Sequence, residues 1–212
     1  LDHYHRALRL VAPDATLPTV ATHGKTDWQI ILELLAASDQ SPALAPEVSR
    51  QLDQLAAGFL GIERLQLLPN VREALTLLAQ HGIRNGLLTG NSMLRSRHKL
   101  AGAGLDPALI DWEASFFGTL AAQRSELAHA ARLGYPSQRL LVIGDTPFDG
   151  RAAAAAGIPF LGLCTGTYVR SDFDAIAAIS IADDLNTNTL KLILGELQPS
   201  PDALAGERQP TG

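Results

Sequence analysis

The chain has 212 residues, of which 46% are apolar and 18% are charged, and its formal net charge is -5. This composition is typical of a soluble globular protein, and the mild acidity argues against nucleic-acid binding through a basic surface. No apolar run approaches the roughly 20 residues that span a bilayer, so we expect no membrane partner. The single cysteine, Cys164, excludes an intrachain disulfide and favours a reducing, cytoplasmic location.

The chain starts at Leu1, and its only methionine is Met93. A translation product normally starts with methionine, so we expect this sequence to be part of a longer protein. The sequence gives no indication of the oligomeric state.

Residues 1–65 have the pattern of a small helical domain. Apolar residues recur at helical spacing in three stretches, and no strand pattern lies among them. The predicted helices cover Tyr4 to Val11, Trp28 to Leu35 and Val48 to Phe59. Thr26 or Asp27 is a plausible N-cap for the second of them.

Residues 66–195 alternate between short apolar strands and helices, which predicts an α/β domain with a parallel sheet covered by helices on both faces. The continuous apolar run within Arg139–Gly144 suits a strand that is buried on both faces. Residues 196–212 are rich in Pro and Gly, and we expect a flexible tail there. The predicted strands are Ile83–Thr89, Ser115–Phe117, Arg139–Gly144, Pro159–Leu163 and Ile179–Ala182.

Two carboxylates follow the strongest of these strands, in the segment Ile143-Gly144-Asp145-Thr146-Pro147-Phe148-Asp149. Ligands of open α/β sheets bind at this carboxyl edge, and two acidic groups close together suit a hard divalent cation such as Mg²⁺. The alternative is that Asp145 is a turn residue and Asp149 a helix cap, and the spacing alone leaves both interpretations open.

Another predicted strand ends in Thr89-Gly90-Asn91. Thr89 could donate a hydrogen bond to a phosphate oxygen, and Gly90 allows the backbone to approach a ligand closely. An ordinary strand-to-helix turn capped by Asn91 or Ser92 explains the same residues.

Two further segments carry charges in unusual places. Arg124 begins a predicted helix, where a cation is unfavourable against the helix dipole, and this position hints that it faces an anion, although a solvated surface arginine is the simpler interpretation. The loop that contains Lys25 and Asp27 precedes a helix and could reach over a site, although a capping loop is the simpler interpretation.

Taken in order and spacing, these segments resemble the haloacid dehalogenase superfamily, and specifically its phosphoglycolate-phosphatase-like hydrolases. The resemblance covers nearly the whole chain and implies a Rossmann-like core with a small helical cap. It is carried by Gly24-Lys25-Thr26-Asp27, Leu68-Pro69-Asn70-Val71, Leu88-Thr89-Gly90-Asn91, Arg124 and Ile143-Gly144-Asp145-Thr146-Pro147-Phe148-Asp149.

The resemblance implies hydrolysis of a small phosphomonoester through an aspartyl-phosphate. Thr89 and Arg124 would hold the phosphoryl oxygens, and Asp145 and Asp149 would bind Mg²⁺. Asp145 is thereby also a catalytic residue. The residues expected to contact the substrate are Gly90, Asn91, Lys25 and Asp27.

The sequence departs from the family at its first motif. That motif is a strand ending in Asp-x-Asp-x-Thr, it should precede the cap, and it forms the middle of the sheet beside Arg139–Gly144. It is absent here, and Asp183-Asp184 are adjacent rather than alternating. Without this central strand, of roughly five to six residues, its two neighbours lose ladder partners. We therefore expect poor folding or a gap in the sheet, and an inactive 212-residue chain.

Three alternatives stay open. A noncatalytic binding or regulatory protein that has lost its nucleophile would keep the same fold. A phosphomutase would use the same cap. A haloacid dehalogenase needs no metal, so the paired carboxylates Asp145 and Asp149 argue against it.

Overall fold

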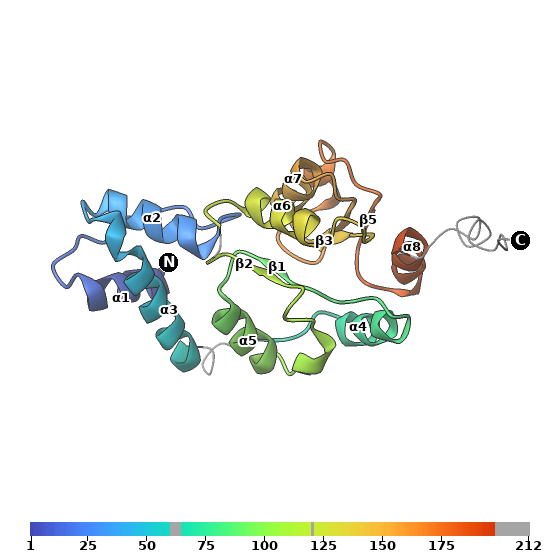
Figure 1. The fold of residues 1–212 in the computed structure, drawn as a ribbon, viewed down its shortest axis with the longest axis horizontal. Helices are drawn as coiled ribbons and strands as arrows, with labels where there is room; N and C mark the ends of the chain where they lie inside the picture. Colours follow the sequence, from blue (N-terminus) through green and yellow to red (C-terminus); the bar gives the residue numbers. More distant parts are fainter. Residues whose placement is uncertain (60–64, 120, 198–212) are drawn as a thin grey trace, which may run out of the picture.

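The computed structural model describes residues 1–59, 65–119 and 121–197, so most of the tail predicted at 196–212 lies outside the described residues. A helical region and an α/β region are visible in Figure 1. The helical region contains α1 (Asp2–Val11), α2 (Asp27–Ala37), the 3₁₀ helix η1 (Pro42–Leu44) and α3 (Ala45–Phe59). The three helices predicted before residue 60 are confirmed.

The helical region has a closed apolar core. Of the two predicted candidates, Thr26 is the N-cap of α2, and its side chain accepts a hydrogen bond from the backbone N–H of Gln29. The apolar faces of the three helices meet in one cluster, whose buried members include Tyr4, Leu8, Ile30, Ile31, Leu34, Leu35, Val48 and Leu52.

The α/β region alternates strands and helices along the chain. The parallel strands are short, and helices lie between them. In chain order the elements are α4 (Val71–Gln80), β1 (Leu88–Thr89), α5 (Met93–Gly102), η2 (Pro107–Leu109), β2 (Phe116–Phe117), α6 (Arg124–Gly134), β3 (Val142–Gly144), α7 (Pro147–Ala155), β4 (Phe160–Leu163), η3 (Arg170–Phe173), β5 (Ser180–Ala182) and α8 (Thr187–Leu197).

The strands form two separate parallel sheets rather than one. β1 pairs with β2, and the other sheet has the order β3-β4-β5. Among the described residues no strand lies between β1 and β3. The gap therefore falls where the missing central strand was expected.

The strands beside the gap are shorter than predicted. β1 covers Leu88–Thr89 instead of Ile83–Thr89, and β3 covers Val142–Gly144 instead of Arg139–Gly144. The prediction that this second strand is buried on both faces is wrong, because the side chain of Ile143 is 36% exposed. Each of these strands has a ladder partner on one side only, whereas β4 has two and is buried throughout.

Helices cover both faces of the α/β region. On one face, α4 and α8 pack through Ala74, Leu78 and Ile193 against Leu161 of β4. On the other face, Ala131 of α6 belongs to the cluster that surrounds Phe160, Leu88 and Val142, together with residues of α7. None of the described helices is long and apolar enough to cross a membrane.

Candidate active site

Loops from both regions meet at the carboxyl ends of β1 and β3. A Cβ added at Gly24 would lie 2.6 Å from the ring of Phe148, so the loop of the helical region rests directly on the first turn of α7, two residues after the loop that follows β3. A Cβ at Gly90 would lie 2.6 Å from the carbonyl oxygen of Lys25, so the same region also touches the turn that follows β1. The backbone N–H of Asp27 donates to the Gly90 carbonyl over 2.7 Å. Glycine is needed at Gly90 because another backbone occupies the position of a side chain.

Asp149 is buried and serves as a helix cap as well as an ion-pair partner. Its carboxylate accepts hydrogen bonds from the backbone N–H and hydroxyl of Thr146 in a capping box at the start of α7. Its other oxygen accepts a 2.6 Å bond from Nη1 of Arg124. Burial raises the pKa of this carboxyl, the charge of Arg124 lowers it, and the nearby carboxylate of Asp145 raises it.

Arg124 begins α6, as predicted, and one of its donors has no partner. Its Nε is buried and makes no hydrogen bond to any described residue. A buried N–H without an acceptor costs about 1–3 kcal/mol. An anion bound beside the Arg124–Asp149 pair would supply the acceptor.

Asp145 follows β3 and lies close to a second loop. A Cβ added at Gly166 would collide with Oδ2 of Asp145, so the glycine makes room for this carboxylate. Asp145 and Asp149 together offer hard oxygen donors. Mg²⁺ is commonly bound by one or two carboxylates plus water and substrate phosphate. The carboxylate of Asp145 is exposed and suits such an ion, whereas both oxygens of Asp149 already accept hydrogen bonds from Arg124 and Thr146. The described residues contain no group of three or more His, Cys, Asp or Glu side chains that could hold a metal by themselves.

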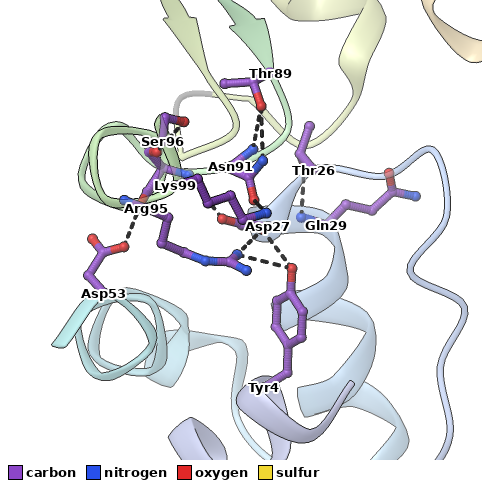
Figure 2. Close-up of polar contacts among 11 residues, drawn as sticks. Tyr4, Thr26, Asp27, Gln29, Asp53, Thr89, Asn91, Arg95, Ser96 and Lys99 are labelled. Atoms are coloured by element: carbon purple, nitrogen blue, oxygen red, sulfur yellow. Dashed lines mark hydrogen bonds and ion pairs between the residues drawn. The ribbon is translucent and has the colours of Figure 1, made fainter. Parts of the chain in front are cut away.

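Thr89 is the last residue of β1. Its hydroxyl oxygen accepts bonds from the backbone N–H and the side-chain amide of Asn91, over 3.2 and 3.0 Å (Figure 2). The amide oxygen of Asn91 in turn accepts from Nζ of Lys99. Both acceptor positions of the Thr89 hydroxyl are thus used, and among the described residues its hydrogen has no acceptor, so it can donate to an oxyanion.

Figure 2 shows that Asp27 joins the helical region to the α/β region. Asp27 as a residue is 3% exposed. Its carboxylate accepts from the hydroxyl of Tyr4 over 2.6 Å, from Nη1 of Arg95 over 2.5 Å and from the backbone N–H of Ser92 over 2.9 Å. Lys25 is paired with Glu33 over 2.5 Å. The substrate contacts assigned to Lys25 and Asp27 stay predictions, and the structure gives both side chains protein partners.

The sequence analysis missed the residues around Asp27. Tyr4 was counted only as part of an apolar stripe, and Arg95 was not considered. Arg95 lies in the first turn of α5, where a cation opposes the helix dipole. The signal that indicates Arg124, a cation in the first turn of a helix, is therefore present at Arg95 as well.

One Asp-x-Asp spacing was also overlooked, at Asp172-Phe173-Asp174. Both carboxylates are exposed, and they lie in and directly after η3 rather than at the end of a strand. Asp172 accepts a hydrogen bond from the backbone N–H of Val169 and so caps η3. This pair does not replace the missing first motif.

Comparison with known proteins gives consistent results. A family model for haloacid dehalogenase-like hydrolases matches residues 3–157. A phosphoglycolate phosphatase from Rhodospirillum rubrum is 31% identical over 140 residues, which are 64% of this chain and 56% of that protein. The matched part therefore spans little more than half of this relative's length.

Solved structures share the fold. A hydrolase from Pseudomonas syringae has a TM-score of 0.64 and 20% identity, covering 91% of this chain and 90% of its own. CbbY from Rhodobacter sphaeroides, solved in complex with phosphate, has a TM-score of 0.66 and 15% identity, covering 90% of this chain and 92% of its own.

Proposed function

Because the chain belongs to the haloacid dehalogenase-like hydrolase family, we propose that it forms the phosphate- and metal-binding part of a Mg²⁺-dependent phosphatase that acts on a small phosphomonoester. The observation that carries this proposal is the unsatisfied, buried Nε of Arg124 beside the carboxylates of Asp149 and Asp145. A cation with a free donor next to two oxygen ligands suits a phosphate and a divalent ion in one place.

Each residue has a proposed task. Arg124 binds one phosphoryl oxygen through Nε and keeps Nη1 on Asp149, which fixes the direction of its guanidinium group. Thr89 donates its hydroxyl hydrogen to another phosphoryl oxygen. Asp145 and Asp149 hold Mg²⁺, and the bound ion offsets the repulsion between carboxylates and phosphate.

The nucleophile is proposed to be an aspartate at the end of a strand between β1 and β3. Its carboxylate oxygen attacks phosphorus, the bond from phosphorus to the leaving oxygen breaks, and the alcohol leaves with a proton from a second acid. Water then hydrolyses the aspartyl-phosphate. Positioning by Thr89 and Arg124 supplies much of the acceleration in such a reaction.

The binding half of this proposal can be tested on the 212-residue chain itself. Isothermal titration calorimetry with MgCl₂ and inorganic phosphate should show that each ligand tightens the binding of the other. Asp145→Asn should weaken Mg²⁺ binding at least tenfold, and Arg124→Ala should weaken phosphate binding similarly, since each removes a direct charged contact. Asp174→Asn, an exposed carboxylate outside the site, is the matched control.

The catalytic half needs a form of the protein that carries an Asp-x-Asp strand. It should release phosphate from p-nitrophenyl phosphate only with Mg²⁺, and Asp145→Asn should abolish the release. Turnover that is equally fast in EDTA would refute the roles of Asp145 and Asp149.

A noncatalytic binding protein is the second candidate. The observation that favours it is that no described carboxylate stands at the end of a strand between β1 and β3. It predicts tight Mg²⁺ and phosphate binding without turnover in every form of the protein. Phosphate transfer between two hydroxyl groups of a sugar, without net hydrolysis, would instead identify a phosphomutase.

A further inference from the structure

Three side chains form a hydrogen-bonded chain that leads away from the proposed phosphate site (Figure 2). The side-chain amide of Asn91 donates from Nδ2 to Oγ1 of Thr89 over 3.0 Å, and Nζ of Lys99 donates to Oδ1 of Asn91 over 3.1 Å. Both bonds are partly buried. Lys99 lies in the last turn of α5 and has no task in the function proposed above.

The ammonium group of Lys99 lies near the start of α5, although its backbone lies near the end. A lysine in the last turn of a helix ordinarily complements the negative end of the helix dipole. Here the side chain extends the other way, in the direction in which helix side chains tilt, and reaches Asn91, the residue before the N-cap Ser92. A cation is unfavourable at that end of a helix. The contact with Asn91, and not the helix dipole, therefore accounts for where this ammonium group lies.

Lys99 determines which way round the amide of Asn91 is held. An ammonium group has donors and no acceptor, so it can face only the carbonyl oxygen of the amide. The NH₂ group of Asn91 must then face Thr89, whose hydroxyl oxygen becomes an acceptor. The backbone N–H of Asn91 donates to the same oxygen over 3.2 Å. The hydroxyl hydrogen of Thr89 is thereby directed away from Asn91, where it can meet an oxyanion.

The reversed amide would have the opposite effect. If Oδ1 of Asn91 faced Thr89, the hydroxyl would donate its hydrogen to that oxygen and could not donate it to a ligand. The reversed amide would also turn its NH₂ group towards the ammonium group of Lys99, so that two donors would face each other. Donors without an acceptor are unfavourable in a partly buried place, so Lys99 excludes this orientation.

We propose that Lys99 is a positioning residue for phosphate binding, because it fixes the direction of the Asn91 amide and thereby the direction in which the Thr89 hydroxyl donates. The inference rests on the proposed function, since the oxyanion concerned is the phosphate assigned to Thr89 above. Asn91, which the sequence analysis expected to contact the substrate, acts in this proposal through its side chain on Thr89.

A double-mutant cycle tests the proposal. The probe is inorganic phosphate, and the measurement is isothermal titration calorimetry of the 212-residue chain in MgCl₂. Lys99→Met should weaken phosphate binding about tenfold, the size expected when one hydrogen bond to a charged group is lost. Thr89→Val, which lacks the hydroxyl, should cause a similar loss. The double variant should bind as Thr89→Val does, to within about twofold, because Lys99 acts only through that hydroxyl.

Further variants separate the effect of direction from that of charge. Lys99→Arg keeps a cation that can only donate, and it should bind phosphate within about threefold of the wild type. Lys191→Met removes the same charge from an exposed position on α8 and should leave phosphate binding unchanged to within about twofold. Circular dichroism checks folding. If Lys99→Met unfolds, Lys99→Gln replaces it in the cycle, because a glutamine amide can present either a donor or an acceptor to Asn91.

The side-chain amide of Asn91 gives a readout that needs no phosphate. In the wild type, one of its two Nδ2 hydrogens should exchange with water more slowly than those of Asn188, an exposed residue of α8, because it is bonded to Thr89. Lys99→Met should reduce this protection, and Lys99→Arg should keep it. Proton NMR of the ¹⁵N-labelled protein measures the exchange.

The outcomes distinguish this proposal from simpler roles of Lys99. A loss in Lys99→Met that is as large in the Thr89→Val background as in the wild type would mean that Lys99 attracts phosphate through space, and would overturn the proposal. Unchanged phosphate binding in Lys99→Met, or hydrogens of Asn91 that exchange as fast as those of Asn188, would overturn it as well. If the wild type binds no phosphate, the proposed function fails, and the exchange of the Asn91 hydrogens still shows whether Lys99 fixes that amide.

Discussion

The helical region and the α/β region differ in how completely their apolar residues are buried. In the helical region Ile31 and Leu34 are 0% exposed within a cluster shared by three helices. In the α/β region a cavity of about 710 Å³ lies beside β3, and Ile143 is 36% exposed. A helix satisfies its backbone internally and needs only a packing partner, whereas a strand pairs all of its backbone groups only when it has a neighbour on each side. The packing of the α/β region therefore depends on a strand between β1 and β3, where the described residues place none.

The ion pair between Asp27 and Arg95 joins the helical region to the α/β region. Breaking it should give the largest loss of stability. In Asp27→Asn, Arg95 is left as a buried charge without a carboxylate, which we expect to lower the free energy of unfolding by about 3–5 kcal/mol. Urea denaturation followed by circular dichroism measures the change. The double substitution Asp27→Asn with Arg95→Met removes both charges and should recover part of the loss. Asp174→Asn serves as the exposed control and should change stability by less than about 0.5 kcal/mol.

Ile31 in the helical region and Ile143 in the α/β region test directly whether the two regions differ in how well they are packed. Ile31→Ala should cost about 2–5 kcal/mol because it leaves a cavity in a closed core. Ile143→Ala should cost about 1 kcal/mol or less, because this side chain is already in contact with solvent and loses less buried surface. Thermal and urea unfolding of the two variants give the values. Equal losses would mean that the two regions are equally well packed.

The smallest expected effect concerns pH and a contact between α3 and the turn after β1. Burial raises the pKa of Asp53, the hydrogen bond from Ser92 lowers it, and the charge of Asp27 raises it. The folded state therefore holds this proton more tightly than the unfolded state, so Asp53 makes folding less favourable as the pH rises from about 4 through its raised pKa. In Asp53→Asn this dependence should disappear, and the variant should gain stability relative to the wild type between pH 4 and pH 7. The urea midpoints of the wild type and of Asp53→Asn at several pH values measure this gain. If the difference in unfolding free energy between Asp53→Asn and the wild type stays the same across this pH range, the burial of Asp53 is contradicted.

Local signals predicted much of the fold. The caps at Thr26 and Ser92, the start of α6 at Arg124 and the parallel strands follow from residue types that act within a few positions of one another. The gap between β1 and β3 was expected because the sequence lacks the Asp-x-Asp-x-Thr motif. The ion pair of Asp27 with Arg95 joins residues 68 positions apart, and no local pattern indicates it.

The lengths of the strands beside the gap were also beyond local prediction. An apolar run such as Leu140 to Ile143 is typical of a buried strand with a neighbour on each side. Whether the strand forms along its whole length depends on the partners present in space. Arg139–Leu141 lie outside β3 because one side of this segment borders the cavity.

Asp27 ties the helical region to the turn that follows β1. It holds Arg95 and the amide of Ser92, and the Asp27 amide holds the carbonyl of Gly90. If the helical region tilts, it must carry this turn along or expose a guanidinium group. The hydroxyl of Thr89, tied to Asn91 in the same turn, would be reoriented with it. Any tilt of the helical region that keeps these bonds would therefore also change the direction of the Thr89 hydroxyl.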